Sequence, residues 1–185
     1  MIKLLCKPTG GFSLLVALGL MVFGCNTEML QEPQEELLNL ELSAKPADGK
    51  MHFTANLSGD NEVPARDTDA TGVILAHVSK DGTSIHFKLI VANVQTNITG
   101  AHFHMGPAGT NAGVVVNLLN ISDFPPQTTA PVNGILAEGT ITAANLSGAL
   151  KDKPLSDLIS AMQSGNIYTN VHTTTYTGGE IRGQL

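Results

Sequence analysis

The sequence predicts an all-β domain, an antiparallel β-sandwich or barrel that carries one short helix, and three observations lead to this prediction. The chain of 185 residues has the length of one domain with modest extensions. It contains 19 Gly and 9 Pro but only 14% charged residues, a composition typical of short strands joined by many turns. From residue 51 onwards, apolar and polar residues alternate with the period of two that half-buried strands show.

Strand candidates follow one another closely between residue 51 and the C-terminus. Asp81-Gly82 separates two of them and is a typical hairpin-turn dipeptide. Two runs, 73–78 and 114–119, are almost continuously apolar, which is expected of central strands that are covered on both faces. The predicted strands are 53–57, 73–78, 85–91, 98–105, 114–119, 138–142, 167–172 and 180–185.

One segment changes from the strand period to the helical period. Pro154 stands where a helix can begin, and Gly165 stands where it can end. Between them, apolar residues recur at i, i+3, i+4 and i+7, which predicts a short helix packed on the sheet: Leu155, Leu158, Ile159 and Met162.

The N-terminal segment 1–24 is interpreted as a lipoprotein signal peptide. Two lysines precede an uncharged run, 12–23, that suits a secretory signal but is too short to span a bilayer. The run is followed by Gly24-Cys25, which resembles the lipobox of bacterial lipoproteins, where the cysteine is acylated and becomes the mature N-terminus. The alternative is an ordinary signal peptide followed by an incidental cysteine.

Cys25 is therefore expected to attach the protein to a membrane. The other cysteine, Cys6, lies in the signal, so the mature chain has no internal disulfide and acylation gives Cys25 a role. Each buried acyl CH₂ contributes ~0.8 kcal/mol, so several acyl chains anchor the protein stably. Residues 25–50 form the acylated cysteine and a polar, Glu-rich tether. The expected location is the bacterial cell envelope, with the domain facing the periplasm or the cell exterior.

The charge of the chain excludes nucleic acid as a partner. The net charge is −6, and removal of segment 1–24 takes away two lysines and no acid, so it becomes −8. Neither a Gly-x-Ser-x-Gly motif nor a phosphate-binding Gly-x-x-x-x-Gly-Lys loop occurs in the sequence. The sequence therefore offers no candidates for nucleophilic or nucleotide chemistry, and it does not indicate an enzyme.

Three segments of the predicted β-domain carry a family resemblance. They read LSGDNEVP at 57–64, AHFHMG at 101–106, and YTNVHT at 168–173 followed by GEIRGQL at 179–185. In this order and spacing they resemble the CHRD domain, which occurs in chordin and in many microbial exported proteins, and the resemblance covers about residues 51–185. It implies an immunoglobulin-like β-barrel that is distantly similar to copper-zinc superoxide dismutase.

His102, His104 and His172 are the candidate metal ligands. Residues two apart in a strand share a face, so His102 and His104 are expected to lie together while Phe103 packs on the opposite side. Their stretch resembles the His-x-His copper strand of the dismutases, and three neutral imidazoles suit copper or zinc. The alternative is that the three rings hydrogen-bond the backbone or line a polar pocket. The other histidines have weaker claims because each is alone in a predicted strand: His52, His77 and His86.

Arg182 is predicted to form an ion pair with Glu62 or Glu180. It is one of only two arginines, and it lies in the middle of a predicted strand. Glu180 shares its face by the period of two, and Glu62 belongs to another of the resembling segments. The alternative is an exposed pair that contributes ~0–1 kcal/mol.

Two functional hypotheses follow from these observations. The first is a lipid-anchored, non-enzymatic module that binds a protein, a glycan or an ion outside the cytoplasm. The second is a copper- or zinc-binding protein whose histidine site is distantly similar to that of superoxide dismutase.

Replacement of the lipobox cysteine is expected to release the protein from the membrane, because the negatively charged mature chain has no basic patch to hold it there. The wild type should partition into detergent and give the intact mass of an acylated Cys25. A Cys25→Ser protein that still partitions with membranes through its N-terminus would contradict the interpretation.

Overall fold

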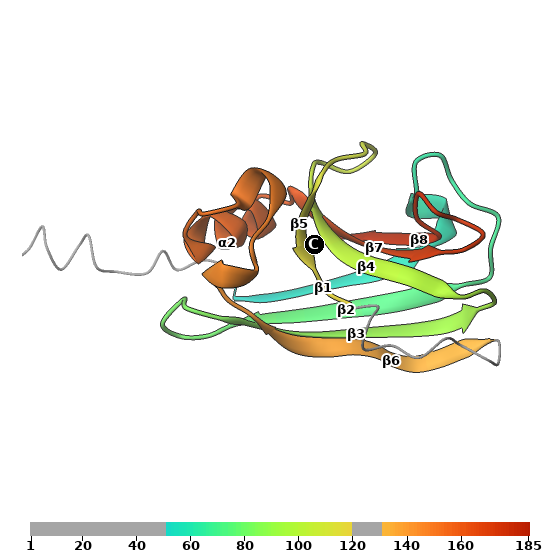
Figure 1. Ribbon diagram of the computed structural model, residues 1–185, viewed down its shortest axis with the longest axis horizontal. Coiled ribbons are helices and arrows are strands. Elements are labelled where there is room, and N and C mark those ends of the chain that lie inside the picture. Colours follow the sequence, from blue (N-terminus) through green and yellow to red (C-terminus); the bar gives the residue numbers. More distant parts are fainter. Residues whose placement is uncertain (1–50, 120–130) are drawn as a thin grey trace, which may run out of the picture. The chain divides into compact units, whose positions relative to one another are not determined.

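The computed structural model describes residues 51–119 and 131–185 (Figure 1). The predicted signal peptide, Cys25 and the tether up to residue 50 lie outside the described residues. Within the two described ranges, none of the helices has both the length and the apolar character needed to cross a membrane.

Eight antiparallel strands form one sheet in this part of the chain, and the all-β prediction is confirmed. Their order across the sheet is β5-β4-β7-β8-β1-β2-β3-β6, so β5 and β6 are its edges. The strands are β1 (His52–Ser58), β2 (Thr71–Val78), β3 (Ile85–Val94), β4 (Ile98–Met105), β5 (Val114–Asn117), β6 (Val132–Ile141), β7 (Ile167–Thr173) and β8 (Ile181–Gln184).

The sheet curls on itself into a half-barrel, so that β4, β7 and β8 lie over β1, β2 and β3 (Figure 1). One core of buried apolar side chains fills the space between these layers and receives residues from both. Phe53 and Leu57 of β1, Ile74 of β2 and Phe103 of β4 are among its largest fully buried members. In β1, Ala55 is buried between Phe53 and Leu57, which gives the spacing of two that the sequence displays. Burial of this apolar surface at roughly 25 cal/mol per Å² drives the curl.

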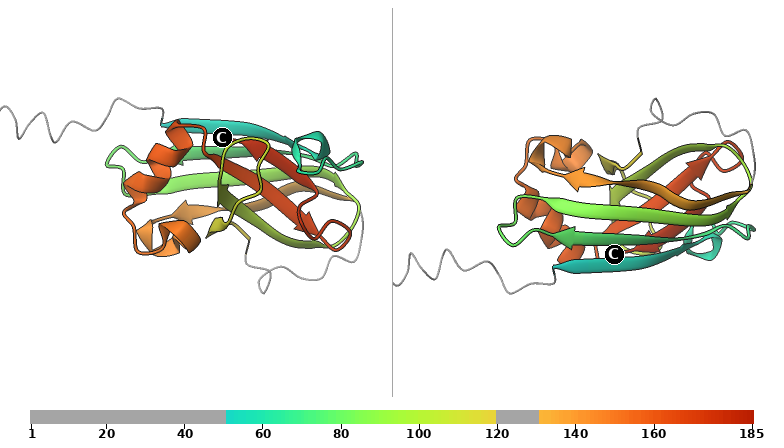
Figure 2. Two further views of the ribbon diagram at one scale, coloured as in Figure 1. Left: turned by 90° about the horizontal axis from the view of Figure 1, so that it is seen from above. Right: turned by 90° about the horizontal axis from the view of Figure 1, so that it is seen from below.

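The predicted helix is also present, as α2 (Leu155–Gln163). Pro154 precedes it, and Gly165 follows it with φ of +68°, a left-handed conformation that favours glycine. α2 and the short 3₁₀ turns η3 (Ala143–Asn145) and η4 (Gly148–Leu150) lie at one end of the curled sheet (Figure 2). The face of α2 that packs on the core comprises Leu155, Leu158, Ala161 and Met162.

Two apolar runs differ from the expectation that strands at 73–78 and 114–119 are central and covered on both faces. In β2, alternate side chains such as Leu75 are exposed, so one face of this strand meets solvent. β5 is an edge strand, and Val116 of β5 is paired with Leu146 beyond the sheet by an isolated bridge. The apolar run of β5 is thus explained by a covering segment rather than by a central position.

A buried ion pair joins β8 to the segment that follows the 3₁₀ turn η1 (Gly59–Asn61). Arg182 Nη2 lies 3.1 Å from Glu62 Oε2, and the two side chains are only 3% and 1% exposed. Arg182 Nε donates to the same oxygen, Nη1 donates to the Thr110 carbonyl at 2.9 Å, and Nη2 donates to Asn111 Oδ1. The guanidinium carbon also lies 3.9 Å from the centre of the Tyr168 ring. Arg182 of β8 therefore contacts three other segments: the one after η1, the loop at residues 110–111, and β7.

Glu180, the other carboxylate considered for this pair, does not contact Arg182. β8 begins one residue after Glu180, and Gly179 has φ of +120°, so the backbone leaves the strand conformation there. The Glu180 carboxylate is buried and accepts a hydrogen bond from Thr68 Oγ1 at 2.7 Å. The period-two argument fails for Glu180 because it lies just outside the strand.

Substitution of Arg182 by methionine is expected to lower the free energy of unfolding by ~3–5 kcal/mol, because it leaves the Glu62 carboxylate buried without its counter-charge. Chemical denaturation measures the effect. Lys88→Met is the matched control: it removes the exposed Lys88–Glu138 pair, whose side chains are 43% and 58% exposed, and should cost only ~0–1 kcal/mol. An Arg182→Met protein with the wild-type denaturant midpoint would contradict the assignment.

Candidate metal centre

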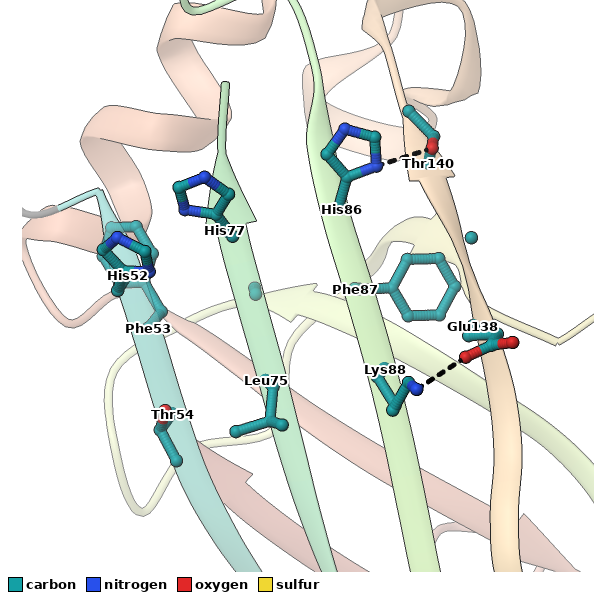
Figure 3. Close-up of a pocket in the computed structure, with 12 residues that line it drawn as sticks. His52, Phe53, Thr54, Leu75, His77, His86, Phe87, Lys88, Glu138 and Thr140 are labelled. Carbon is teal, nitrogen blue, oxygen red and sulfur yellow. Dashed lines mark hydrogen bonds and ion pairs between the residues drawn. The ribbon is translucent and has the colours of Figure 1, made fainter. Parts of the chain in front are cut away.

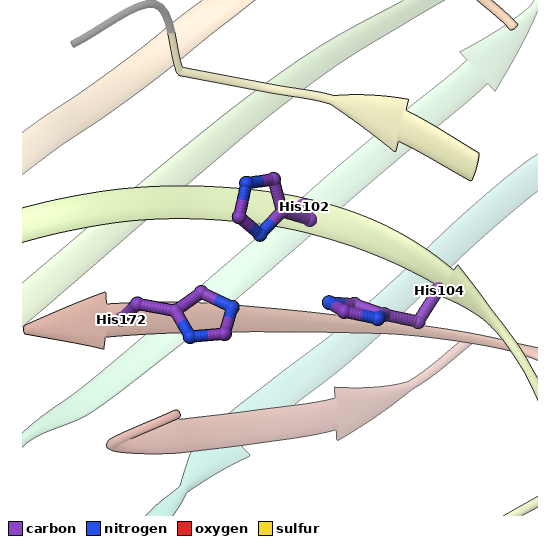
Figure 4. Close-up of side chains that lie close together, drawn as sticks. All are labelled: His102, His104 and His172. Atoms are coloured by element: carbon purple, nitrogen blue, oxygen red, sulfur yellow. The ribbon is translucent and has the colours of Figure 1, made fainter. Parts of the chain in front are cut away.

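Three histidines gather on the face of β4 and β7 that points away from the core (Figure 4). His102 and His104 of β4 flank Phe103, whose side chain is fully buried in the core. His172 comes from β7, where it lies opposite Gly100 of β4. One ring nitrogen from each histidine lies within 4.8 Å of those of the other two. The three candidate ligands therefore meet in one place, as the sequence predicts.

Gly100 makes this meeting possible. A Cβ at residue 100 would lie 2.9 Å from Cε1 of the His102 ring, closer than side chains pack. Because Gly100 has none, the rings of His102 and His172 approach with their centres 4.8 Å apart. The His104 ring centre lies 5.6 Å from that of His102 and 6.0 Å from that of His172.

Backbone carbonyls determine which nitrogen carries the proton in two of the rings. His172 Nδ1 lies 2.9 Å from the Thr177 carbonyl, and His104 Nδ1 lies 2.8 Å from the Ala112 carbonyl. In His172, Nδ1–H donates to the carbonyl and leaves the Nε2 lone pair without a partner in the described part of the chain, whereas His104 Nε2 also lies 2.9 Å from Asn170 Oδ1. Metal-binding histidines are commonly oriented in this way. Within the described residues, His172 Nε2 and His102 Nδ1 are buried and have no hydrogen-bond partner.

Both ring nitrogens of His104 face oxygen atoms of neighbouring residues. Its Nε2 lies 2.9 Å from Asn170 Oδ1: with the proton on Nε2 it donates to this oxygen, and with the proton on Nδ1 it faces the oxygen with a lone pair. The Asn170 amide is held in this orientation because its Nδ2 faces Glu62 Oε1 at 3.4 Å, and turning it over would set two oxygens against each other. Glu62 thus fixes the orientation of Asn170, and Asn170 presents an oxygen to His104.

The surroundings of His102 and His104 favour the neutral forms of these two imidazoles. Burial, together with repulsion from the charged forms of His172 and His104, lowers the pKa of His102 to about 4. Burial also lowers the pKa of His104, although the hydrogen bonds to the Ala112 carbonyl and to Asn170 oppose this shift. Neutral imidazole is the form that binds a metal ion, so these groups are available as ligands near neutral pH.

The donor set of the cluster suits copper or zinc. In the part of the chain that the structure describes, the cluster consists of three imidazoles, without a carboxylate or thiolate among its members. Imidazole nitrogen favours copper and zinc, whereas calcium and magnesium prefer oxygen ligands. Three protein ligands also leave a coordination position open. The cluster could therefore hold a transition-metal ion.

The sequence-based prediction of the site does not include Tyr168 and Asn170. The Tyr168 ring stacks on the His104 ring with centres 4.7 Å apart and planes 2° from parallel, and Asn170 contacts His104 Nε2. Both precede His172 at intervals of two in β7. The alternation that places two histidines on one face of β4 would have found these residues too, since it places Tyr168, Asn170 and His172 on one face of β7.

Acidification of the protein in a chelating buffer is expected to lower its stability between about pH 6.5 and about pH 4. In this window the unfolded chain binds a proton at His102 that the folded chain does not bind, so the free energy of unfolding falls as the pH falls. Urea denaturation across this range measures the slope. His102→Gln should give a shallower slope than the wild type, and identical slopes would contradict the assigned environment of His102.

A model of the CHRD domain family matches residues 53–185, the range that contains all three resembling segments and the whole candidate site. No curated protein and no solved structure matches the chain. Because the family model covers well over half of the sequence, the chain belongs to the CHRD domain family.

Proposed function

We propose that this CHRD domain protein binds one copper or zinc ion through His102, His104 and His172, and that it acts as a binding protein rather than as an enzyme. The observation that carries the proposal is the pair of buried nitrogens, His102 Nδ1 and His172 Nε2, without hydrogen-bond partners among the described residues. A buried polar atom without a partner costs ~1–3 kcal/mol. A metal ion bound between the rings would satisfy both nitrogens at once.

The hydrogen bonds around the rings support the same proposal. The Thr177 carbonyl holds the Nδ1–H group of His172, so its Nε2 lone pair is oriented before any ion arrives, and the Ala112 carbonyl fixes the His104 ring. With the His104 proton on Nδ1, His104 Nε2 and Asn170 Oδ1 both present lone pairs that a cation would accept. Ligands that are already oriented and neutral lose little entropy and release few protons on binding.

Copper is expected to bind more tightly than zinc. The affinity of a nitrogen site for divalent metals rises along the first transition row to a maximum at copper and then falls at zinc. When a metal is bound, its open coordination position supplies a Lewis-acidic site for water or an anion. Which metal the protein carries in the cell depends on metal supply as well as on this order.

The proposal includes a location at the bacterial cell envelope, with a lipid anchor at Cys25. The signal-like N-terminus and the occurrence of similar domains in exported microbial proteins support it. Both cysteines, Cys6 and Cys25, precede the matched domain, so the proposed site relies on histidine alone and needs no thiolate ligand.

Calorimetric titration of the full chain, purified in detergent without a histidine tag and stripped of metal, tests the proposal with Cu²⁺ and Zn²⁺ in separate experiments. The wild type is expected to show one tight site that is absent from His102→Ala/His104→Ala. His86→Gln, which removes an exposed imidazole from another strand, is the matched control and should keep the tight site. Equal, weak binding by wild type and double variant would eliminate the site and favour a module for a protein or glycan.

A further inference from the structure

The three histidines outside the candidate metal centre form a row across neighbouring strands (Figure 3). His52 of β1 lies opposite His77 of β2, and His77 lies opposite His86 of β3. All three side chains are exposed. Each is isolated in the sequence, and only the pairing of the strands brings them together.

His52 and His77 form the closest pair in this row. The Val78 N–H donates to the Met51 carbonyl at 2.9 Å, so His52 and His77 face each other at a non-hydrogen-bonded position, where opposite side chains approach most closely. Their ring centres are 4.1 Å apart and their planes are 22° from parallel. Across the described residues, neither imidazole takes part in a hydrogen bond, so all four ring nitrogens are available.

His86 differs from the other two members of the row. Its Nδ1 lies 3.0 Å from Thr140 Oγ1 on the edge strand β6, so one of its nitrogens already has a partner. It also faces His77 at a hydrogen-bonded position, where strands hold opposite residues further apart. Among the described residues, His52 and His77 thus form a pair without hydrogen-bond partners, whereas His86 already contacts Thr140.

The row borders a surface groove of about 600 Å³. The two charged residues that also line this groove have opposite charges that cancel. Lys88 and Glu138 line the groove and pair with each other, with Nζ and Oε2 3.0 Å apart (Figure 3). The positive charge of Lys88 is balanced within the groove, so a cation near the histidines meets no net repulsion from this pair.

We propose that His52 and His77 form a second metal site, exposed on the sheet surface, that takes Cu²⁺ or a similar divalent transition-metal ion. Cross-strand neighbours have Cβ atoms ~4.5–5.5 Å apart, so two imidazoles can turn one nitrogen each towards a shared ion. Both rings are exposed and free to make this turn, and water fills the other coordination positions. The proposal is independent of the buried centre at His102, His104 and His172.

Retention on immobilised Cu²⁺ favours the exposed pair over the buried centre, because His52 and His77 are exposed whereas His102, His104 and His172 are buried or partly buried. The full chain in detergent, without a histidine tag, is applied to a Cu²⁺–iminodiacetate column and eluted with imidazole. Wild type should be retained, and His77→Gln should bind roughly tenfold or more weakly. His86→Gln is the matched control from the same row and should elute with the wild type.

The double variant His52→Gln/His77→Gln shows whether the two rings bind one ion together. If they do, the double variant loses no more retention than either single variant, since removing one ligand already destroys the site. Additive losses would mean two independent surface histidines and would overturn the proposal. Elution of His77→Gln with the wild type, or loss of retention in His86→Gln, would also overturn it. The substituted side chains are exposed on the surface. Circular dichroism melts that match the wild type would show that the variants fold.

Discussion

The buried ion pair between Arg182 and Glu62 is the interaction on which the rest of the structure depends. Desolvation costs several kcal/mol for each buried ion, so the pair is tolerated only when the remaining donors and acceptors are also satisfied. The Thr110 carbonyl and Asn111 Oδ1 satisfy the guanidinium, and Asn170 Nδ2 satisfies the second oxygen of Glu62. The pair therefore fixes the segment after η1, the loop between β4 and β5, and the strands β7 and β8 relative to one another.

The same pair orients the candidate metal centre. Glu62 accepts a hydrogen bond from the Asn170 amide nitrogen and so determines the orientation of this amide. In that orientation the amide oxygen faces Nε2 of His104. A buried ion pair contributes little net stability compared with apolar residues of similar volume, so we infer that orientation is what this pair supplies. Gly179 is required beside it, because its φ is +120° and an added Cβ would overlap the Glu62 carboxylate. The resembling segments 57–64 and 179–185 are thus parts of one buried contact.

The sequence predicted the strands, the helix and the three clustered histidines because each depends on a local period or on a recognisable family segment. It could not choose between Glu62 and Glu180 as the partner of Arg182, since that choice depends on the backbone turn at Gly179, just before β8. The alternation along β7 could have placed Asn170 on the same face as His172. Its contact with Glu62 could not be predicted in this way, because the two residues are 108 positions apart. The row of His52, His77 and His86 depends on strand register, which single-strand periodicity does not reveal.

X-ray absorption at the zinc edge of the zinc-loaded full chain tests the central claim, a three-imidazole metal centre, most directly. The experiment uses one equivalent of metal in the His52→Gln/His77→Gln background, so that the exposed pair does not contribute to the spectrum. The account predicts about three imidazole nitrogens at ~2.0–2.1 Å, with the outer-shell scattering of histidine rings, and their loss when His172 is also replaced by alanine. A first shell made of oxygen alone, or an identical spectrum after the His172 substitution, would contradict it.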